Sequence, residues 1–413
     1  MAEIIPFRGL LYDVSKVSIG AVVAPPYDII TDERRELLYR QSPYNIVRID
    51  FGKEEPGDHE AGDKYSRARE YLDTWIKDGI LTRSDQPSFY VYEMIYTIHG
   101  VRKRLAGFLC LVKLEELGRG NIYPHECTHS SPKKDRLSLL RVCEANTSPI
   151  FSLYKGSGDG ISRILSRETV TNPHLQAEDS SGNLHRLWVI DQNDQIEIIK
   201  QELADKTIFI ADGHHRYETS FEYRREMLAK MTSASGRKSY DYTLMFLADL
   251  KDEGITILPT HRLIREIPTD IHRLISKYFE VETITSDFDI RERLYGRKNA
   301  IGFFGRQEKV WHVLTYRGRN LSDVRPDLRE IDVIILHELI LKKILPNAEI
   351  GYEMDIVKAL GQVHRGEYAA AFFLNSTRVE DVEKSALSST RMPPKSTYFY
   401  PKLLTGLVLN KWT

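Results

Sequence analysis

The sequence predicts an α+β fold built around a mixed sheet. Two strand-like apolar segments, 88–98 and 103–114, flank a His99-Gly100 turn and are expected to pair antiparallel. From residue 137 to residue 249, strand-like and helix-like segments then alternate. With 41% hydrophobic residues in a chain of 413, there are enough apolar side chains for a full core and for more than one domain.

The N-terminal elements follow from prolines and capping residues. Residues 4–28 are expected to form a strand that leads into a loop, because Pro25 and Pro26 favour extended backbone. Residues 31–41 are expected to form a helix, since Thr31 can cap it and acidic residues occupy its first turn. A second helix is expected over 59–77.

The later elements define two regions. Segment 118–136 is rich in Gly, Pro, Ser and Lys and is expected to be a long functional loop. Strand 207–211 precedes a helix over 217–230, and a second region carries a strand at 300–305 and an apolar helix at 331–345. We expect a core domain over 1–265 and a smaller α/β region over 266–413, with the tail 391–408 returning to the site.

Composition excludes several classes of protein. The 58 basic and 59 acidic residues nearly cancel and form no long basic run, so no nucleic-acid partner is expected. No stretch of eighteen apolar residues and no leader-like segment occurs, so the protein is expected to be cytoplasmic and not in a membrane. Three cysteines without CxxC spacing indicate neither a disulfide framework nor a thiolate zinc site. The sequence leaves the oligomeric state open.

The best candidate site is the turn Asp212-Gly213-His214-His215-Arg216. A strand that turns through glycine into a helix directs backbone N–H groups and the positive end of the helix dipole at one point, where anions bind. Arg216 adds a planar fork that matches phosphate oxygens, and Asp212 could accept a proton or hold magnesium. A purely structural turn capped by Asp212 is the simpler alternative.

The segment that follows Pro124 admits two interpretations. His125, Glu126 and His129 match the HExxH pattern of zinc proteases, which needs a regular helix. Residues 130–132, Ser-Ser-Pro, are expected to end such a helix within about two turns. The segment can instead be a polar loop that supplies acid, base and phosphate-binding groups, or only a solvated one; its polar residues are His125, Glu126, Thr128, Lys133, Asp135 and Arg136.

Two further segments carry candidate groups. In the tail, Lys395, Ser396, Thr397 and Lys402 lie among prolines and aromatic residues and could bind phosphate oxygens, although GxxxxGK[ST] is absent. Near the N-terminus, Tyr27-Asp28 follows two prolines, and Asp28 is a candidate base. An aromatic tail packed on the surface and an ordinary turn are the structural alternatives.

These segments together resemble the family named domain of unknown function 1015. The matching stretches are APPYDII, PHECTHSSPKKDRLSLL, IADGHHRYET and MPPKSTYFYPKLLTGLV, which span nearly the whole chain. The DGHHR turn also resembles the phosphate-binding strand-turn-helix of the ParB and sulfiredoxin type of fold, in which free serine kinases occur. The resemblance therefore implies such an element within the mixed-sheet core.

The resemblance implies a pyrophosphate-dependent kinase that phosphorylates free L-serine to O-phospho-L-serine. Magnesium is then the expected cofactor, and no nucleotide is expected, in keeping with the absence of a Walker A motif. By analogy His214, His215 and Arg216 would hold the phosphates, with help from Lys133, Arg136, Lys395 and Lys402. Asp212, Glu126 and Asp28 compete for the role of base, with Asp212 or Glu126 favoured.

Other functions stay open on the sequence alone. A phosphoserine phosphatase and an ADP- or ATP-dependent serine kinase would use the same groups. A DNA-associated regulator of ParB type would need a helix-turn-helix and a basic face, and neither stands out. A zinc protease would need the helical HExxH geometry described above.

Overall fold

The computed structural model describes residues 2–58, 63–128, 130–156, 158–230, 238–284, 290–388 and 390–412. The chain forms two compact units. The first comprises Met1–Pro124, Thr128–Thr256 and Pro401–Thr413, and the second comprises His125–Cys127 and Ile257–Tyr400. The chain thus enters the second unit at residues 125–127 and again at residue 257, and it returns to the first unit at 401, whereas a single boundary after residue 265 was expected.

The first unit is built on a mixed sheet. In the described part of the chain the strand order is β6-β11-β8-β12-β5-β4-β10-β9, and β1 pairs with β5. The pairs β11–β6 and β12–β8 are parallel and the others are antiparallel. The strands are β1 Ile4–Ile5, β4 Phe89–Ile98, β5 Val101–Lys113, β6 Ile122–Pro124, β8 Ile150–Tyr154, β9 Leu175–Glu178, β10 Leu184–Ile190, β11 Ile208–Asp212 and β12 Tyr242–Asp249.

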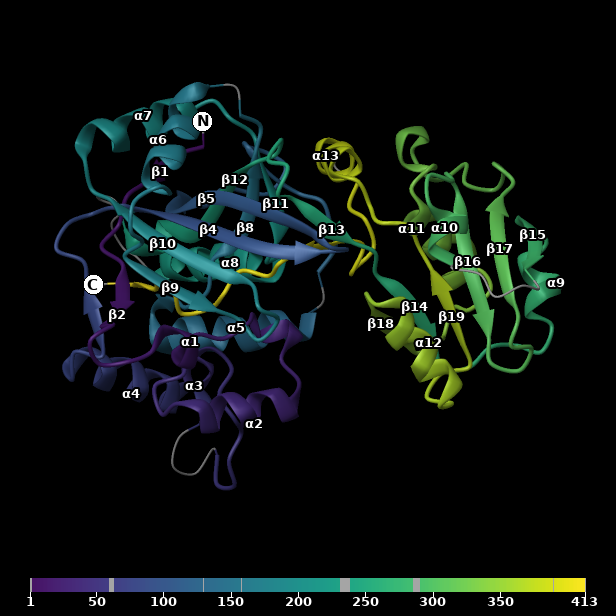
Figure 1. Ribbon diagram of the computed structural model, residues 1–413, viewed down its shortest axis with the longest axis horizontal. Coiled ribbons are helices and arrows are strands. Elements are labelled where there is room, and N and C mark those ends of the chain that lie inside the picture. Colours follow the sequence, from purple (N-terminus) through teal and green to yellow (C-terminus); the bar gives the residue numbers. More distant parts are fainter. Residues whose placement is uncertain are drawn as a thin grey trace. The chain divides into compact units, whose positions relative to one another are not determined.

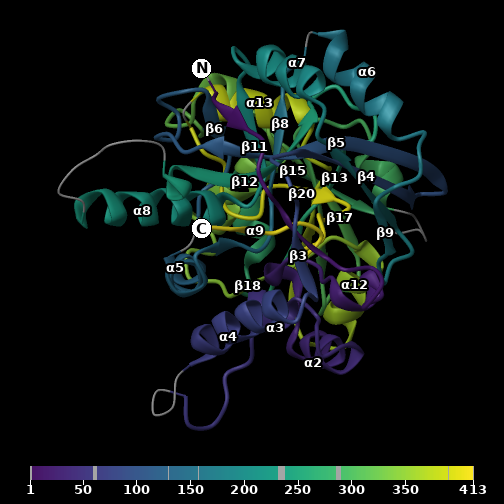
Figure 2. The same ribbon diagram turned by 90° about the vertical axis from the view of Figure 1, so that its left-hand side faces the viewer.

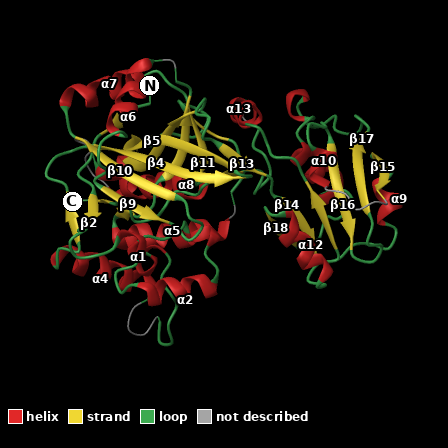
Figure 3. Ribbon diagram, in the orientation of Figure 1, coloured by secondary structure: helices red, strands yellow, loops and turns green. Residues whose placement is uncertain are grey.

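Helices surround this sheet (Figure 1). Figure 3 shows α6 and α7 on one side of the strands and α1, α2, α4 and α5 on the other. The predicted helix over 31–41 is α2, whose cap Thr31 accepts the N–H of Arg34 at 3.2 Å. The helices are α1 Ile19–Val22, η1 Tyr27–Ile29, α2 Asp32–Gln41, α3 Val47–Asp50, α4 Lys64–Lys77, α5 Ser130–Cys143, α6 Asp159–Glu168, α7 Asn193–Leu203, α8 His214–Lys230 and η2 Ser239–Asp241.

Both faces of the central strands are buried, which is why β4 and β5 carry apolar runs and not strict alternation. One face packs on α6 and α7 through residues such as Phe108 and Ile199. The two chain ends run side by side in this unit, since Leu10 and Leu409 exchange backbone hydrogen bonds of 2.9 Å. Two small pairs complete the unit: β2 Leu10–Tyr12 with β3 Leu81–Arg83, and β7 Ala145–Asn146 with β21 Asn410–Lys411.

The predicted hairpin is confirmed. Strands β4 and β5 pair antiparallel, and the turn places His99 at φ 49° and Gly100 at φ 76°. Two residues with positive φ are the geometry of the tight turn that matches the twist of a hairpin. The mixed α+β class is thereby established for the first unit.

The second unit holds an antiparallel sheet in the order β15-β17-β16-β19-β14-β18 among its described strands. An α/β region was expected here, and that prediction is wrong. The strands at 300–305 and 311–316 are joined by a short turn with Lys309 at φ 54°, and so short a connection permits only antiparallel pairing.

Helices pack on both faces of this sheet. One apolar core joins it to α9, α11 and η4, and a second joins it to α10 and α12. The predicted helix over 331–345 is α11 followed by the wider π-type turns of η4. The elements are β13 Thr256–Leu258, β14 His261–Ile264, β15 Phe279–Ile284, β16 Ala300–Gly305, β17 Trp311–Tyr316, β18 Ile350–Glu353, β19 Ala370–Phe373, β20 Tyr398–Tyr400, α9 Ile271–Ile275, α10 Ile290–Leu294, η3 Pro326–Leu328, α11 Asp332–Ile335, η4 Leu336–Leu341, α12 Ile356–His364 and α13 Val379–Leu387.

Several predicted elements differ from the structure. The helix expected over 59–77 is α4, which begins at Lys64 after its cap Asp63, and the segment 4–28 contains the helix α1 as well as short strands. Helix α8 begins at His214 and not at residue 217, so the whole HHR stretch forms its first turn. Residues 118–136 are not one irregular loop, because α5 begins at Ser130. Ser-Ser-Pro starts this helix instead of ending one: a proline in the first turn has no N–H to lose to an intrahelical bond. Helix α5 lies between α8 and α4 (Figure 2).

Candidate active site

The DGHHR turn joins the strand β11 to the helix α8, as predicted. Asp212 is the last residue of β11, and Gly213 makes the turn at φ 94°. A Cβ on Gly213 would lie 2.9 Å from Nη2 and 3.0 Å from Nε of Arg216. The glycine is therefore needed twice, for its backbone conformation and for the space that the guanidinium occupies.

Asp212 lies between two cations. Lys402 Nζ donates to its Oδ1 at 2.9 Å, and Arg216 Nη2 donates to its Oδ2 at 3.1 Å. Arg216 also donates from Nη1 to the carbonyl oxygen of Pro149. Lys402 and Arg216 have side chains only 8% and 12% exposed, so the two cations are held largely out of water beside the positive end of α8.

A third cation, Arg136, lies near this turn. Arg136 on α5 donates from Nη1 to Asp50 Oδ1 at 3.3 Å, and its guanidinium lies 4.1 Å from the centre of the Tyr27 ring. Burial raises the pKa of Tyr27, and the charges of Arg136 and Arg216 both oppose that rise. Tyr27 thus lies within electrostatic reach of both arginines and stays a neutral phenol.

A cavity of about 40 Å³ is lined by both arginines, Arg136 and Arg216. Its lining includes Asp50, Arg136, Thr147, Arg216 and Thr219. Three atoms of the lining residues are buried without a hydrogen-bond partner: Asp50 Oδ2, Arg216 Nε and Thr219 Oγ1. Buried donors and acceptors without partners are costly, so a water molecule or a polar ligand group is favoured in this cavity.

Asp50 and Thr147 were missed by the sequence reasoning. Asp50 is 2% exposed, and Thr147 donates its hydroxyl to Asp50 Oδ1 at 2.6 Å, which fixes the carboxylate that holds Arg136. The sequence does carry a signal for Asp50, because this charged residue lies between the apolar residues Ile49 and Phe51. An aspartate is rarely buried without a cationic partner, so its position indicates a buried ion pair.

The predicted phosphate ligands Thr128 and Lys133 contact a carboxylate here. Thr128 Oγ1 donates to Glu218 Oε2 at 2.7 Å, and Lys133 Nζ donates to the same oxygen at 2.5 Å. Glu218 lies on α8, one turn after the HHR stretch. These contacts tie the start of α5 to α8.

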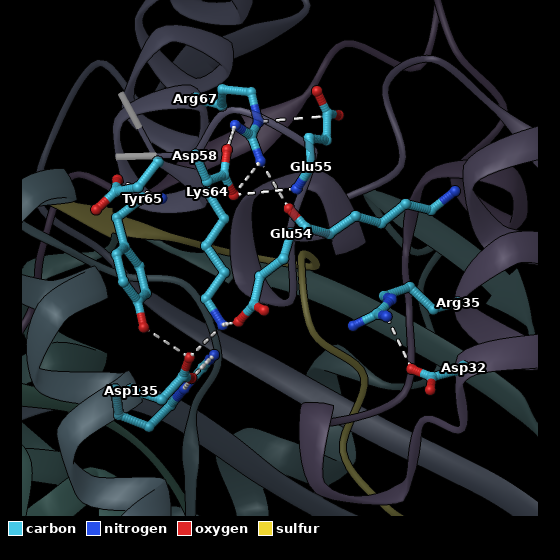
Figure 4. Close-up of polar contacts among 12 residues, drawn as sticks. Asp32, Arg35, Glu54, Glu55, Asp58, Lys64, Tyr65, Arg67 and Asp135 are labelled. Atoms are coloured by element: carbon cyan, nitrogen blue, oxygen red, sulfur yellow. Dashed lines mark hydrogen bonds and ion pairs between the residues drawn. The ribbon is translucent and has the colours of Figure 1, made fainter. Parts of the chain in front are cut away.

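Asp135 belongs to a polar network at the junction of α4 and α5 (Figure 4). It accepts hydrogen bonds from Tyr65 Oη at 2.9 Å and from Arg136 Nη2 at 2.6 Å, and Lys64 Nζ lies 3.0 Å away. Burial by itself would raise the pKa of Asp135, but Arg136 and Lys64 outweigh it and leave that pKa lowered. Asp135 is therefore an anion that contacts Arg136 and Lys64, and its predicted part in substrate binding stays a prediction.

Five predicted residues lie in the second unit. Glu126 accepts the backbone N–H of Lys395 at 2.7 Å and that of Ser396 at 3.2 Å. The fully buried His125 lies 2.9 Å from Thr397 Oγ1 through its Nε2. Glu126 thus holds the turn in which Lys395 has a φ of 60°.

The remaining predicted residues vary in exposure. Asp28 is exposed in η1, His215 is half-buried, and His214 is buried in the first turn of α8.

Residues 125–128 are not helical, and Glu126 instead pairs as a bridge with Met392. The HExxH interpretation requires His125 and Glu126 on a helix, so it is not met; His129 lies outside the described residues.

Comparison with known families gives one match. Residues 4–334 match the family described as Protein of unknown function (DUF1015). The chain belongs to this family. Membership agrees with the resemblance drawn from the four sequence stretches, three of which lie inside the matched range. No curated protein matches the chain.

Several solved structures share a distant likeness. A conserved hypothetical protein from Pyrococcus furiosus is 13% identical with a TM-score of 0.36, covering 68% of this chain and 89% of its own. A free serine kinase in complex with AMP is 12% identical with a TM-score of 0.38, and the match covers 69% of this chain and 92% of the kinase. SbnI with C-terminal truncation from Staphylococcus aureus is 10% identical with a TM-score of 0.38, and the match covers 72% of this chain and 85% of SbnI. TM-scores below 0.5 carry no conclusion about this chain.

Among the described residues, no helix is both long and apolar enough to cross a membrane.

Proposed function

We propose that this protein transfers a phosphoryl group from inorganic pyrophosphate to the hydroxyl of free L-serine. The observation that carries the proposal is the pairing of Arg216 and Lys402 with one carboxylate, Asp212, at the start of α8. Two largely buried cations and a helix N-terminus suit the oxygens of a phosphate chain. The acceptor and donor themselves come from the family resemblance.

The contacts of Asp212 support a role as the base. Oxygens of a bound pyrophosphate would compete with this carboxylate for Arg216 and Lys402. Asp212 would then lose part of its charge compensation at the moment when substrate arrives, and a carboxylate with fewer cationic partners is the better proton acceptor. The other favoured candidate, Glu126, already accepts two backbone N–H groups with its two oxygens.

The reaction balances with these groups. The serine Oγ attacks the terminal phosphorus of pyrophosphate, and Asp212 takes the hydroxyl proton. The bond between that phosphorus and the bridging oxygen breaks, and orthophosphate leaves. Arg216, Lys402 and Arg136 would offset the charge on the transferred group, because phosphoryl transfer depends mainly on positioning and charge neutralisation.

Magnesium enters this proposal with the substrate. Both oxygens of Asp212 already contact cations, so this carboxylate does not fit a resident metal ion. We therefore place Mg²⁺ on pyrophosphate, as part of the donor complex. No step above depends on a metal ion held by the protein.

The test is a donor comparison with purified protein, L-serine and magnesium. Pyrophosphate, ADP, ATP or no donor is added separately, and O-phosphoserine is followed by phosphorus NMR. Product with pyrophosphate alone supports the proposal, and product only with ADP or ATP overturns the donor. Absence of product with every donor refutes the kinase, and release of phosphate from added O-phosphoserine would identify a phosphatase.

Variants connect the activity to the site. Arg216→Lys and Lys402→Met should each lower kcat/KM for pyrophosphate by about 100-fold, the effect of removing one charge-stabilising donor. Arg141→Lys is the matched control, because Arg141 lies on α5 and forms an exposed pair with Glu226. Equal activity in Arg216→Lys and the control would place the chemistry elsewhere.

A further inference from the structure

The second unit brings three potential metal ligands together far along the chain from the DGHHR turn. His272 Nε2 lies 2.6 Å from Glu308 Oε1, and His312 Nε2 lies 3.2 Å from Glu308 Oε2. The ligand atoms of all three residues fall within 4.8 Å of one another. His272 comes from α9, His312 from β17, and Glu308 from the turn between β16 and β17.

The two imidazoles are fixed by their neighbours. Their ring centres lie 4.7 Å apart, and both rings pack on Phe303, at 5.6 Å from His272 and 6.0 Å from His312. His312 Nδ1 lies 3.1 Å from the hydroxyl of Thr283. In the tautomer in which Nδ1 donates to that hydroxyl, Nε2 carries the lone pair that a metal ion requires, and such outer contacts orient histidine ligands.

The contact between His272 and Glu308 is not an ordinary hydrogen bond. His272 Nε2 is buried and has no hydrogen-bond partner, although a carboxylate oxygen lies 2.6 Å away. Ligands bound tetrahedrally to zinc at about 2.0–2.1 Å lie roughly 3.3 Å from each other. Glu308 lies 2.6 Å from His272 and 3.2 Å from His312, and no two of the ligand atoms are more than 4.8 Å apart, so the observed separations lie on both sides of roughly 3.3 Å. A small shift of the exposed Glu308 side chain would therefore complete the geometry.

The three residues adjoin a large cavity. His272 and Glu308 line a volume of about 730 Å³, within the range of small-molecule sites. Arg306 and Lys309 line the same cavity, and neither side chain has a hydrogen bond or ion pair within the described ranges of the chain. Gly366 makes room for Arg306, since a Cβ there would lie 2.6 Å from its Cζ. Glu266 and Glu308 line the cavity as well; once Glu308 binds a cation, Arg306 and Lys309 outnumber the remaining carboxylate, and the cavity then favours anions.

We propose that His272, Glu308 and His312 bind one zinc-type divalent ion, whose remaining coordination position opens to this cavity and accepts an oxygen anion. Two histidines and one carboxylate with an open fourth position are a ligand set that zinc uses. The site is separate from the proposed kinase site and does not depend on it. Its ligands and cavity lie wholly within the second unit.

The test uses the full-length protein, freed of metal with a chelator and titrated with Co²⁺ and Zn²⁺. We expect one equivalent of Co²⁺ to give the visible absorption of a four- or five-coordinate ion, and Zn²⁺ to displace it. Glu308→Gln and His272→Gln should weaken binding by at least about tenfold. His364→Gln, an exposed histidine of α12 in the same unit, is the control and should bind as the parent does.

Two outcomes would overturn the proposal. One is absence of stoichiometric binding by the parent protein, and the other is equal binding by Glu308→Gln, His272→Gln and the control. Circular dichroism of each variant checks its fold, and the ligands His272 and Glu308 are the less buried ones, so these variants should fold. Added inorganic phosphate should change the Co²⁺ spectrum of the parent but not that of Arg306→Gln; equal spectra with and without phosphate would remove the anion from the proposal.

Discussion

Substitution of Gly213 by alanine tests the phosphate site most directly. The residue has a φ of 94°, where an L side chain costs about 1–2 kcal/mol. The new Cβ would also lie 2.9 Å from Arg216 Nη2, so the guanidinium must move. Arg216 would then leave Asp212 and the carbonyl of Pro149, and loss of such buried charged contacts costs about 1–3 kcal/mol more.

Gly57 provides the matched control. Its φ is 92°, and a Cβ there would meet nothing within 4 Å. Gly57→Ala should therefore carry the backbone strain of about 1–2 kcal/mol without displacing any side chain. The expected total for Gly213→Ala is about 2–5 kcal/mol, and the difference between the two variants isolates the displacement of Arg216.

Two assays separate stability from binding. Urea unfolding followed by tryptophan fluorescence gives the loss of stability, and calorimetric titration with magnesium pyrophosphate gives the affinity. We expect both variants to unfold at lower urea than the parent, and only Gly213→Ala to lose affinity, by about 10-fold or more for one charge-assisted contact. If Gly213→Ala binds pyrophosphate as tightly as Gly57→Ala, the turn does not position Arg216 for phosphate.

Three further predictions concern other parts of the chain. Lys133 contacts Glu218, so Lys133→Met should change pyrophosphate affinity by less than about twofold in the same titration and the unfolding free energy by no more than about 1 kcal/mol. A larger loss of affinity would show that Lys133 binds phosphate. Glu126→Gln should lower the unfolding free energy of the second unit by about 1–3 kcal/mol, since an amide cannot accept two N–H groups with its two terminal atoms. Unchanged urea unfolding, followed by circular dichroism, would contradict this. Burial raises the pKa of Asp332 from its ordinary value of 3.8 to about 6, so the folded state favours the protonated carboxyl. The resulting contribution to folding stability is fully present below pH 3.8 and is lost as the pH rises through 6. Asp332→Asn should remove this dependence and gain about 2 kcal/mol relative to the parent between pH 4.5 and 7.5, and parallel pH profiles would refute it.

Local signals in the sequence predicted elements with strong local causes. The hairpin followed from a two-residue turn between apolar runs, and the start of α2 followed from Thr31 as a cap. The strand-turn-helix at Asp212 followed in the same way, although α8 begins three residues earlier than expected. Proline signals were less reliable, because the same residue can begin a helix or end one, and Ser-Ser-Pro begins α5.

The sequence by itself determined the α+β class, the family and the DGHHR turn, because hydrophobic period, turn residues and short motifs are local properties. Only the tertiary structure decided which charges meet. Lys402 reaches Asp212 across 190 residues of chain, Asp50 reaches Arg136 across 86, and His272 meets Glu308 from a different element. Such pairings depend on strand order and helix packing, and the spacing of residues along the chain does not encode them.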